Sequence, residues 1–265
     1  MQGRFSAWLL HQIRLYLLAL QFFTRIPVPA AVGFEPLWLQ QSARYFPWVG
    51  ILVGAFTALL YWLANLCWPP LVAVLLSTAG GVWLTGAFHE DGFADVCDGF
   101  GGSVSAARVF EIMKDSRLGT YGSVGLGLLM ALKVASLASM PPPLALAALL
   151  LAHPLSRLFP TLMLWRMRYA REEGKAKPMA EQMSGRECLI ALVGALLPAV
   201  GLLAAGVLRW QSLLLAVLLA TLACGWLVRM FLRRINGFTG DCLGATQQLT
   251  EVALYLGLLA KCNWF

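Results

Sequence analysis

Three closely spaced aspartates form the most chemically informative feature of this 265-residue sequence. Asp91, Asp95 and Asp98 lie between Gly86 and Gly102, and if that stretch is helical the three carboxylates share one face. Like charges held so close repel one another, and no basic residue intervenes. A bound hard cation such as Mg²⁺ offsets such repulsion. The spacing therefore predicts a carboxylate-held metal, which is typical of enzymes that act on phosphorylated substrates.

Two further polar segments extend this prediction. Asp241 lies in a glycine-rich segment, and we expect it to be either another metal ligand or the base that takes a proton from an attacking hydroxyl. Lys114 and Arg117 are expected to bind diphosphate oxygens, since a guanidinium makes a two-pronged contact. The alternative for this basic pair is a role as anchors at the membrane surface.

Several ionisable residues at or within apolar runs are candidates as well. Glu90 is predicted to join the metal ligands. His89 is expected either to act as a base or to cap a membrane span. His153 and Arg157 lie one helical turn apart. Since ionisable groups inside a membrane are costly, this spacing predicts a pocket role for Arg157, with snorkelling to the interface as the alternative.

The elements that position these residues are membrane helices. The chain is 59% hydrophobic and 12% charged, about half the charge of a typical globular domain. Apolar runs of roughly 20 residues recur, each long enough to cross a bilayer. The sequence therefore predicts an all-α, polytopic helical membrane protein with a single catalytic domain over 1–265. The net charge of +7 does not indicate nucleic-acid binding, because the basic residues lie between apolar runs.

The apolar runs predict six to seven transmembrane helices. The runs cover 48–68, 71–88, 118–140, 144–165, 188–208 and 213–232, followed by a last apolar segment at 249–265. A first helix over 7–25 carries four polar residues, which is typical of an interfacial helix or of a marginal span. The polar segments at 104–117 and 233–248 are expected to connect helices.

Charge then predicts the orientation. Six basic residues crowd the segment 166–187, namely Arg166, Arg168, Arg171, Lys175, Lys177 and Arg186. Since cytoplasmic loops carry an excess of Lys and Arg, this segment is predicted to be cytoplasmic. Counting spans outward places 90–117 and 233–248 on the same side, so we expect one acidic site at the cytoplasmic face.

Five segments resemble one known family. The segments 23–29, 43–47, 89–99, 112–119 and 239–245 are similar, in this order, to those of bacterial cobalamin synthases, which are adenosylcobinamide-GDP ribazoletransferases. The resemblance implies an Mg²⁺-dependent, multi-pass enzyme of the bacterial cytoplasmic (inner) membrane. It implies that adenosylcobinamide-GDP is joined to α-ribazole, or to its 5′-phosphate, with release of GMP. It adds Arg25, Arg44, Asp115 and Ser116 as substrate-binding candidates. The resemblance alone identifies the corrinoid.

Two other functions are weighed against this one. Asp95, Asp98 and Gly99 also resemble part of the motif of CDP-alcohol phosphotransferases, but Gly102 and Ser103 depart from it. A cation transporter would favour carboxylates near span midpoints, whereas these lie at a helix end and in connections. The expected partners are the two substrates and the lipid bilayer, with no nucleic acid. Self-association and association with other cobalamin-assembly enzymes are both left open.

Overall fold

A computed structural model describes residues 2–171 and 183–260, so Lys175 and Lys177 of the basic segment lie outside the described residues. The described part is helical, and its one β-type contact is an isolated bridge between Tyr169 and Phe238. The elements are α1 (Gln2–Phe23), η1 (Ala30–Val32), α2 (Pro36–Ser42), η2 (Ala43–Tyr45), α3 (Phe46–Asn65), α4 (Pro70–Thr85), α5 (Phe88–Gly102), α6 (Ala106–Ile112), α7 (Thr120–Ala138), α8 (Pro142–Arg166), α9 (Gly185–Ala204), α10 (Trp210–Ile235) and α11 (Gly240–Leu259). The predicted all-α fold is confirmed.

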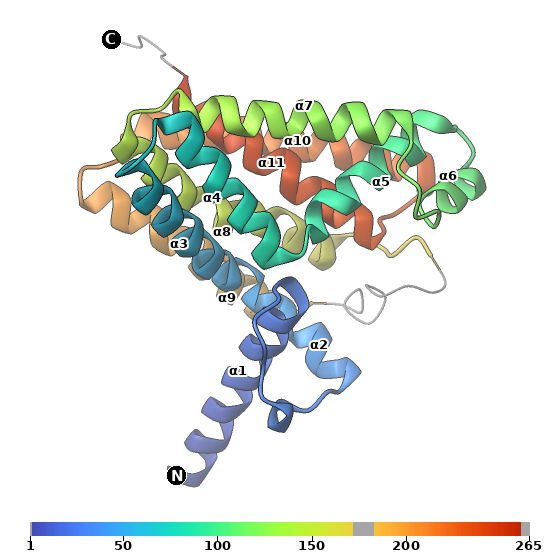
Figure 1. The fold of residues 1–265 in the computed structure, drawn as a ribbon. Coiled ribbons are helices and arrows are strands. Elements are labelled where there is room, and N and C mark those ends of the chain that lie inside the picture. Colours follow the sequence, from blue (N-terminus) through green and yellow to red (C-terminus); the bar gives the residue numbers. More distant parts are fainter. Residues whose placement is uncertain (1, 172–182, 261–265) are drawn as a thin grey trace.

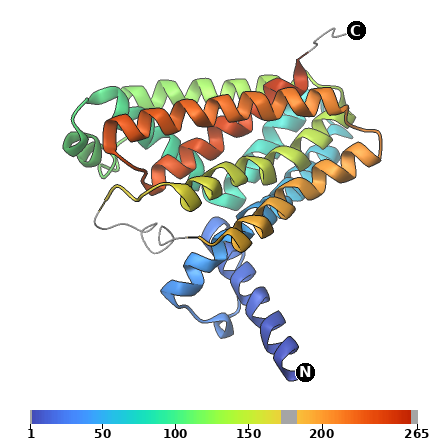
Figure 2. The ribbon, with the colours of Figure 1, turned by 180° about the vertical axis from the view of Figure 1, so that it is seen from behind.

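Five stretches of the described residues are long and apolar enough to cross a membrane. They are Pro36–Asn65, α7, α8, α9 and α10, and the bent pair of α4 and α5 makes a sixth if it is counted as one span. The chain is therefore a multi-pass membrane protein, with five or six candidate spans where the sequence predicted six to seven. The first helix, α1, is not among them, and it projects away from the bundle in both ribbon views (Figures 1 and 2).

A sharp turn between α4 and α5 positions the acidic helix. Gly86 and Ala87 both adopt left-handed backbone angles, with φ of 66° and 58°, and the two helices meet at 89°. Glycine adopts this conformation without steric cost, which suits Gly86 to end α4. The run predicted as one helix over 71–88 thus ends at Thr85, and α5 starts in a new direction.

Helix α11 lies in the interior of the bundle. It packs against α10, α5, α8 and α7, and most of its residues are buried. It begins at Gly240, so the prediction of a connection over 233–248 was wrong for its second half. A helix enclosed by other helices does not need an apolar surface, because neighbouring side chains satisfy its polar groups.

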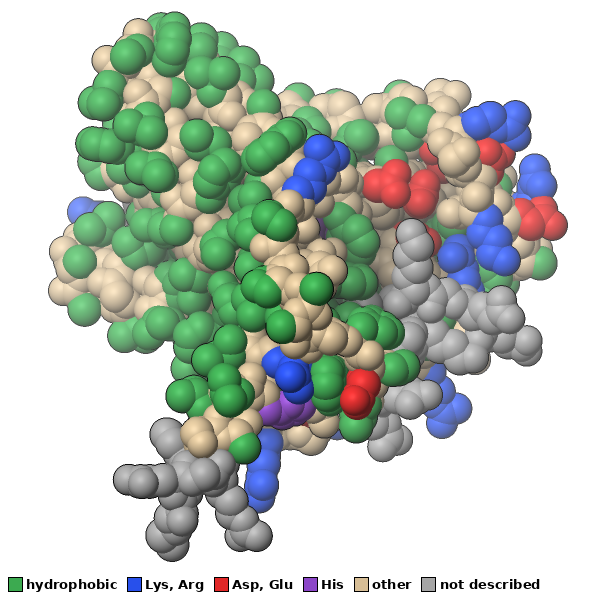
Figure 3. Space-filling model, turned by 60° about the horizontal axis from the view of Figure 1, so that its bottom comes forward, with side chains coloured by type: hydrophobic (Ala, Val, Ile, Leu, Met, Phe, Trp, Pro, Cys, Tyr) green, Lys and Arg blue, Asp and Glu red, His purple; other side chains and the backbone are tan. Residues whose placement is uncertain are grey.

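The polar segments gather at one end of the bundle. In Figure 1 this end carries α5, α6 and the starts of α7 and α11, while the turns after α3, α7 and α9 lie at the opposite end. Figure 3 shows acidic and basic side chains gathered on the same side, with apolar side chains over much of the remaining face. The fold thus brings together segments that are up to about 150 residues apart in sequence, from α5 at Phe88 to α11 at Gly240.

Candidate active site

The three spaced aspartates lie on one helix, as their spacing predicted. Along α5, Asp91 is exposed, Asp95 is partly buried and Asp98 is buried. The face they share therefore runs from solvent into the protein. Within the described part of the chain, the side chains of Asp91 and Asp95 make no hydrogen bond or ion pair.

Asp98 differs from the other two because its carboxylate caps another helix. Oδ2 accepts the backbone N–H of Gly119 and Oδ1 accepts that of Gly122, both at 2.8 Å. These donors lie at the start of α7, where backbone N–H groups lack partners within their own helix. A Cβ atom at either glycine would collide with the Asp98 carboxylate. Asp98 therefore joins α5 to α7, and its predicted catalytic and metal-binding roles stay predictions.

Asp241 approaches the same face of α5 from the start of α11. A Cβ atom on Gly92 would lie 3.1 Å from the Asp241 backbone, so the two helices are in close contact there. The Thr239 side chain caps α11 by accepting the Cys242 N–H, and it also donates to Asp241 Oδ2 at 3.3 Å. Asp241 is therefore held at a helix N-terminus, a position that favours negative charge.

One arginine faces this group of carboxylates. The bridge between Tyr169 and Phe238 ties the segment after α8 to the turn before α11. It places Arg171 with Nη2 at 3.6 Å from Asp241 Oδ2. Arg171 is itself largely buried, and its Nε and Nη2 atoms make no hydrogen bond to the residues that the structure describes. Sequence reasoning used Arg171 only as a marker of topology, and its nearness to Asp241 depends on the fold.

The carboxylates at this site do not by themselves form a complete metal-binding site. Among the described residues, no three Asp, Glu, His or Cys side chains lie close enough together to hold an ion as they stand. Asp241, Asp91 and Asp98 nevertheless lie close enough to Asp95 for their negative charges to repel its carboxylate. Carboxylate oxygens are the donors that Mg²⁺ prefers, and such sites keep several waters.

The segment after α6 presents its charged residues to solvent. Lys114, Ser116 and Arg117 are exposed. Arg117 donates from Nε and Nη2 to both oxygens of Asp115, at 2.6–3.1 Å. These side-chain hydrogen bonds lower the pKa of Asp115 to about 2. The guanidinium fork expected to bind diphosphate is thus paired within its own segment when no substrate is present.

Glu90 and His89 point away from the aspartate face. Both are buried. Glu90 Oε1 accepts a hydrogen bond from Gln248 Nε2 at 3.0 Å, while its Oε2 has no partner among the described residues. The His89 ring is stacked on Phe23, with ring centroids 5.2 Å apart. The structure therefore does not bring Glu90 together with the three aspartates, and its predicted metal-ligand role stays a prediction.

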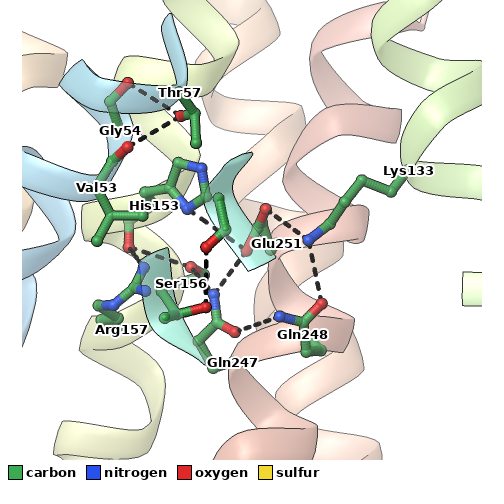
Figure 4. Close-up of polar contacts among 12 residues, drawn as sticks. Val53, Gly54, Thr57, Lys133, His153, Ser156, Arg157, Gln247, Gln248 and Glu251 are labelled. Atoms are coloured by element: carbon green, nitrogen blue, oxygen red, sulfur yellow. Dashed lines mark hydrogen bonds and ion pairs between the residues drawn. The ribbon is translucent and has the colours of Figure 1, made fainter. Parts of the chain in front are cut away.

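A buried polar network lies behind the site, centred on Glu251 (Figure 4). Lys133 Nζ is 3.0 Å and His153 Nδ1 is 3.7 Å from its carboxylate. Gln247 donates to the same carboxylate at 2.6 Å. Sequence reasoning missed Glu251, although it is an acidic residue within the predicted apolar segment 249–265, a signal that could have revealed it.

The predicted arginines occupy three different environments. Arg157 is 2% exposed and donates from Nη1 to the His153 carbonyl oxygen at 2.9 Å, so it packs inside the bundle and does not snorkel. Arg25 is exposed, and its side chain lies beside the turn at Gly86. Arg44 forms an ion pair with Glu187 at the start of α9. The substrate-binding roles of these arginines stay predictions.

Comparison with known proteins gives consistent matches. The family described as cobalamin-5-phosphate synthase matches residues 15–259. A protein of Leptothrix cholodnii named adenosylcobinamide-GDP ribazoletransferase is 48% identical over 264 residues, covering 98% of this chain and 99% of its own length. Proteins with the same name from a Polaromonas species and from Shewanella frigidimarina are 45% and 42% identical, over 93% and 95% of this chain and 96% of their own lengths. No solved structure matches.

Proposed function

The chain belongs to the cobalamin-5-phosphate synthase family, and from this we propose that the junction of α5 and α11 is where its transfer reaction takes place. The enzyme is an adenosylcobinamide-GDP ribazoletransferase. It passes the adenosylcobinamide phosphate moiety from adenosylcobinamide-GDP to α-ribazole, or to α-ribazole 5′-phosphate. A hydroxyl of the ribazole ribose attacks the phosphorus next to the cobinamide, the diphosphate bond breaks, and GMP leaves.

One observation supports this location above others. Asp91 and Asp95 on α5 lie close to Asp241 on α11, although Asp241 is about 150 residues further along the chain. In the part of the chain described, Arg171 is the one basic residue that opposes their negative charge. Uncompensated carboxylates gathered at a helix crossing cost stability, so a functional reason for them is expected.

The donor set fits Mg²⁺, which we propose as the cofactor. Asp91, Asp95 and Asp241 are the residues that would hold it, because their carboxylates are exposed or partly exposed. Unlike the carboxylate of Asp98, they accept no hydrogen bond from the backbone of α7. When bound, the ion supplies positive charge that neutralises the diphosphate oxygens.

The basic residues have a complementary role at this site. Arg171 is positioned to hold Asp241 in place and to contribute positive charge beside the reacting phosphate. Lys114 and Arg117 would bind the diphosphate, which requires Arg117 to exchange Asp115 for phosphate oxygens. Asp241 has two alternative roles, metal ligand or the base that accepts the ribazole hydroxyl proton.

The side of the membrane is also part of the proposal. The basic residues Arg166, Arg168 and Arg171 lie at the end of the bundle that carries α5 and α6, which supports a cytoplasmic position for this end. The enzyme would then be a protein of the bacterial inner membrane that takes both substrates from the cytoplasm. The comparisons give no support to a lipid phosphotransferase or to a cation transporter.

A reconstituted assay tests the function. Purified protein in detergent, given Mg²⁺, adenosylcobinamide-GDP and α-ribazole, is expected to release GMP and to form the coupled corrinoid. The Asp95→Asn variant is expected to lose at least about a hundredfold in rate. The substitution removes the negative charge of the residue that lies between the other carboxylates, and with it a proposed ligand of the metal ion.

The matched control is Glu111→Gln, which removes an exposed carboxylate of α6 that is paired with Arg108. This variant should retain its activity. Near-normal turnover of Asp95→Asn at limiting Mg²⁺ would remove the acidic face from the mechanism. Absence of GMP release by the wild-type protein would overturn the function itself.

A further inference from the structure

Helices α5 and α11 cross where two glycines face each other. A Cβ atom on Gly92 would lie 3.1 Å from the Asp241 backbone, and one on Gly244 would lie 3.5 Å from the Gly92 Cα atom. Glycines let two helix backbones approach closely. They contribute no side chains that interlock, however, so the crossing does not by itself fix how far one helix is displaced along the other. The carboxylates of the proposed site lie on both helices, and their spacing depends on that displacement.

A buried hydrogen bond joins the same two helices beside the crossing. Gln248 Nε2 on α11 donates to Glu90 Oε1 on α5 at 3.0 Å, and the two residues are 2% and 8% exposed. Asp241, Gly244 and Gln248 follow one another at intervals of three and four residues, so they share one face of α11. Asp241 and Gln248 therefore lie on either side of the glycine crossing.

The neighbours of Gln248 fix the orientation of its amide. Its Oε1 accepts a hydrogen bond from Lys133 Nζ at 3.1 Å, and its Nε2 also donates to Gln247 Oε1 at 2.9 Å. A lysine ammonium only donates and an ionised carboxylate only accepts, so a reversed amide would lose both contacts. Lys133 is in turn paired with Glu251 at 3.0 Å (Figure 4). The network centred on Glu251 thus holds Gln248 in one orientation, directed at α5.

On α5, Glu90 and the aspartates point in different directions. Consecutive residues of a helix are about 100° apart around its axis, which turns Glu90 into the bundle while Asp91 remains exposed. Gln248 therefore holds Glu90 from inside and leaves the outer face of the same turn free for a ligand. Because both residues belong to one helical turn, a contact that fixes Glu90 also fixes Asp91.

Resting on the proposed function, we propose that Gln248 is a positioning residue. Through its hydrogen bond to Glu90 it fixes the register of α5 against α11, and this register sets the distance between the carboxylates of the two helices. A slide of one residue along a helix displaces a side chain by about 1.5 Å, and a displacement of about 1 Å at a reacting group costs about a hundredfold in rate. In this role Glu90 supports the site from inside and is not itself a ligand of the ion.

Direct metal binding to the full-length protein in detergent tests this role without turnover. The probe is Mn²⁺, which takes the same oxygen ligands as Mg²⁺ and is detected by electron paramagnetic resonance. Gln248→Leu removes the hydrogen bond to Glu90 and is expected to weaken Mn²⁺ binding about 10- to 100-fold, the usual effect of losing a residue that holds metal ligands in place. Glu90→Gln keeps an acceptor for Gln248 and should bind Mn²⁺ as the wild type does.

A second variant guards against a failure to fold. Gln248→Leu leaves the Glu90 carboxylate buried without its partner, which is destabilising. The double variant Glu90→Leu, Gln248→Leu removes both partners and avoids this cost, and it should lose Mn²⁺ affinity to the same extent as Gln248→Leu. The matched control is Ser156→Ala, which removes a buried hydrogen bond between α11 and α8 that Gln247 donates at 2.9 Å. It should lower thermal stability and leave Mn²⁺ affinity unchanged.

The outcomes separate this role from the proposed function. Wild-type Mn²⁺ affinity in both Gln248→Leu and the double variant would overturn the positioning role alone. Loss of affinity in Glu90→Gln, with none in Gln248→Leu, would make Glu90 a direct ligand and would also overturn it. A wild-type protein that binds no Mn²⁺ would overturn the proposed metal site and this role with it. Weaker Mn²⁺ binding by Gln248→Leu, in a protein whose wild type releases no GMP, would overturn the reaction and support the positioning of the carboxylates.

Discussion

At the residue scale, the pairing of Arg117 with Asp115 determines how the segment after α6 meets an anion. The guanidinium binds both carboxylate oxygens of a residue only two positions away, and the pair is exposed to solvent. Exposed ion pairs contribute little to stability, so a phosphate group competes with Asp115 at small cost. The contact therefore orients the Arg117 guanidinium but leaves it free to exchange Asp115 for a phosphate group.

Replacement of this fork by a point charge is expected to weaken binding of the diphosphate. Arg117→Lys should raise KM for adenosylcobinamide-GDP roughly tenfold, because lysine cannot make the two-pronged contact. The hydrogen bonds from Arg117 lower the pKa of Asp115 to about 2, so Asp115 loses its charge only as the pH falls towards that value. The effect of Arg117→Lys on KM should therefore be constant between about pH 5 and pH 9.

The control for this measurement is Arg108→Lys, which alters a similar exposed ion pair on α6 and should leave KM unchanged. If the Arg117→Lys enzyme keeps the wild-type KM and kcat, Arg117 does not bind the substrate and serves only as an anchor at the membrane surface, before the start of α7.

At the scale of elements, long apolar runs predicted their helices well, whereas polar residues within a helix and sharp turns between helices were predicted poorly. The runs at 144–165 and 213–232 match α8 and α10 to within about three residues at either end. The start of α11 was missed because Gln247 and Gln248 made that part look like a connection, although both face a buried network. The right-angled turn at Gly86 was missed as well, since a single glycine after a span does not predict its direction.

The same limit applies to the acidic face. The spacing of Asp91, Asp95 and Asp98 correctly predicted a shared helical face. It did not predict that Asp98 caps α7, because its partners Gly119 and Gly122 lie more than 20 residues away. Likewise, the nearness of Arg171 to Asp241 follows from an isolated backbone bridge that has no sequence signature.

The cap at Asp98 gives a prediction on stability. Asp98→Ala should lower the free energy of unfolding by about 1–3 kcal/mol, because two backbone N–H groups at the start of α7 lose their acceptor. Asp91→Ala, on the same face of α5 but exposed, should leave stability unchanged or raise it through reduced repulsion. Thermal unfolding of both variants in detergent makes the comparison. Equal stability of the two would show that Asp98 is free to act as a metal ligand and contributes no cap.

At the scale of the whole molecule, the bundle is organised around buried charges. Lys133 on α7 and Glu251 on α11 form an ion pair whose side chains are 7% and 1% exposed, and His153 on α8 completes the group. Such a group contributes less to net stability than apolar packing would, but it fixes which helices pack together and in which register. The network joins the same helix, α11, that carries Asp241, and through Gln248 and Glu90 it also contacts α5.

Breaking this pair is expected to be costlier than removing it. Lys133→Met leaves the buried Glu251 carboxylate without its lysine partner, which should destabilise the protein by about 3–5 kcal/mol. Adding Glu251→Gln to that variant should recover part of the loss, because the buried charge is removed and the amide oxygen still accepts one of the two hydrogen bonds that Gln247 and Tyr255 donate to Glu251. Thermal unfolding of the two single variants and the double variant in detergent forms a double-mutant cycle. Additive effects would show that Lys133 and Glu251 are not coupled.

The orientation of the whole bundle is the last expectation, and two positions at its opposite ends can test it. Cys67 is an exposed native cysteine in the turn after α3, and Ser105 is exposed in the turn before α6, at the acidic end. If the basic segments lie inside, a membrane-impermeant maleimide should label Cys67 in intact spheroplasts. In a Cys67→Ser background, Ser105→Cys should be labelled above the level of its parent only after the membrane is opened. Labelling of Ser105→Cys in intact spheroplasts would place α5 and Asp241 on the outer face, where a cytoplasmic nucleotide-linked substrate could not reach them.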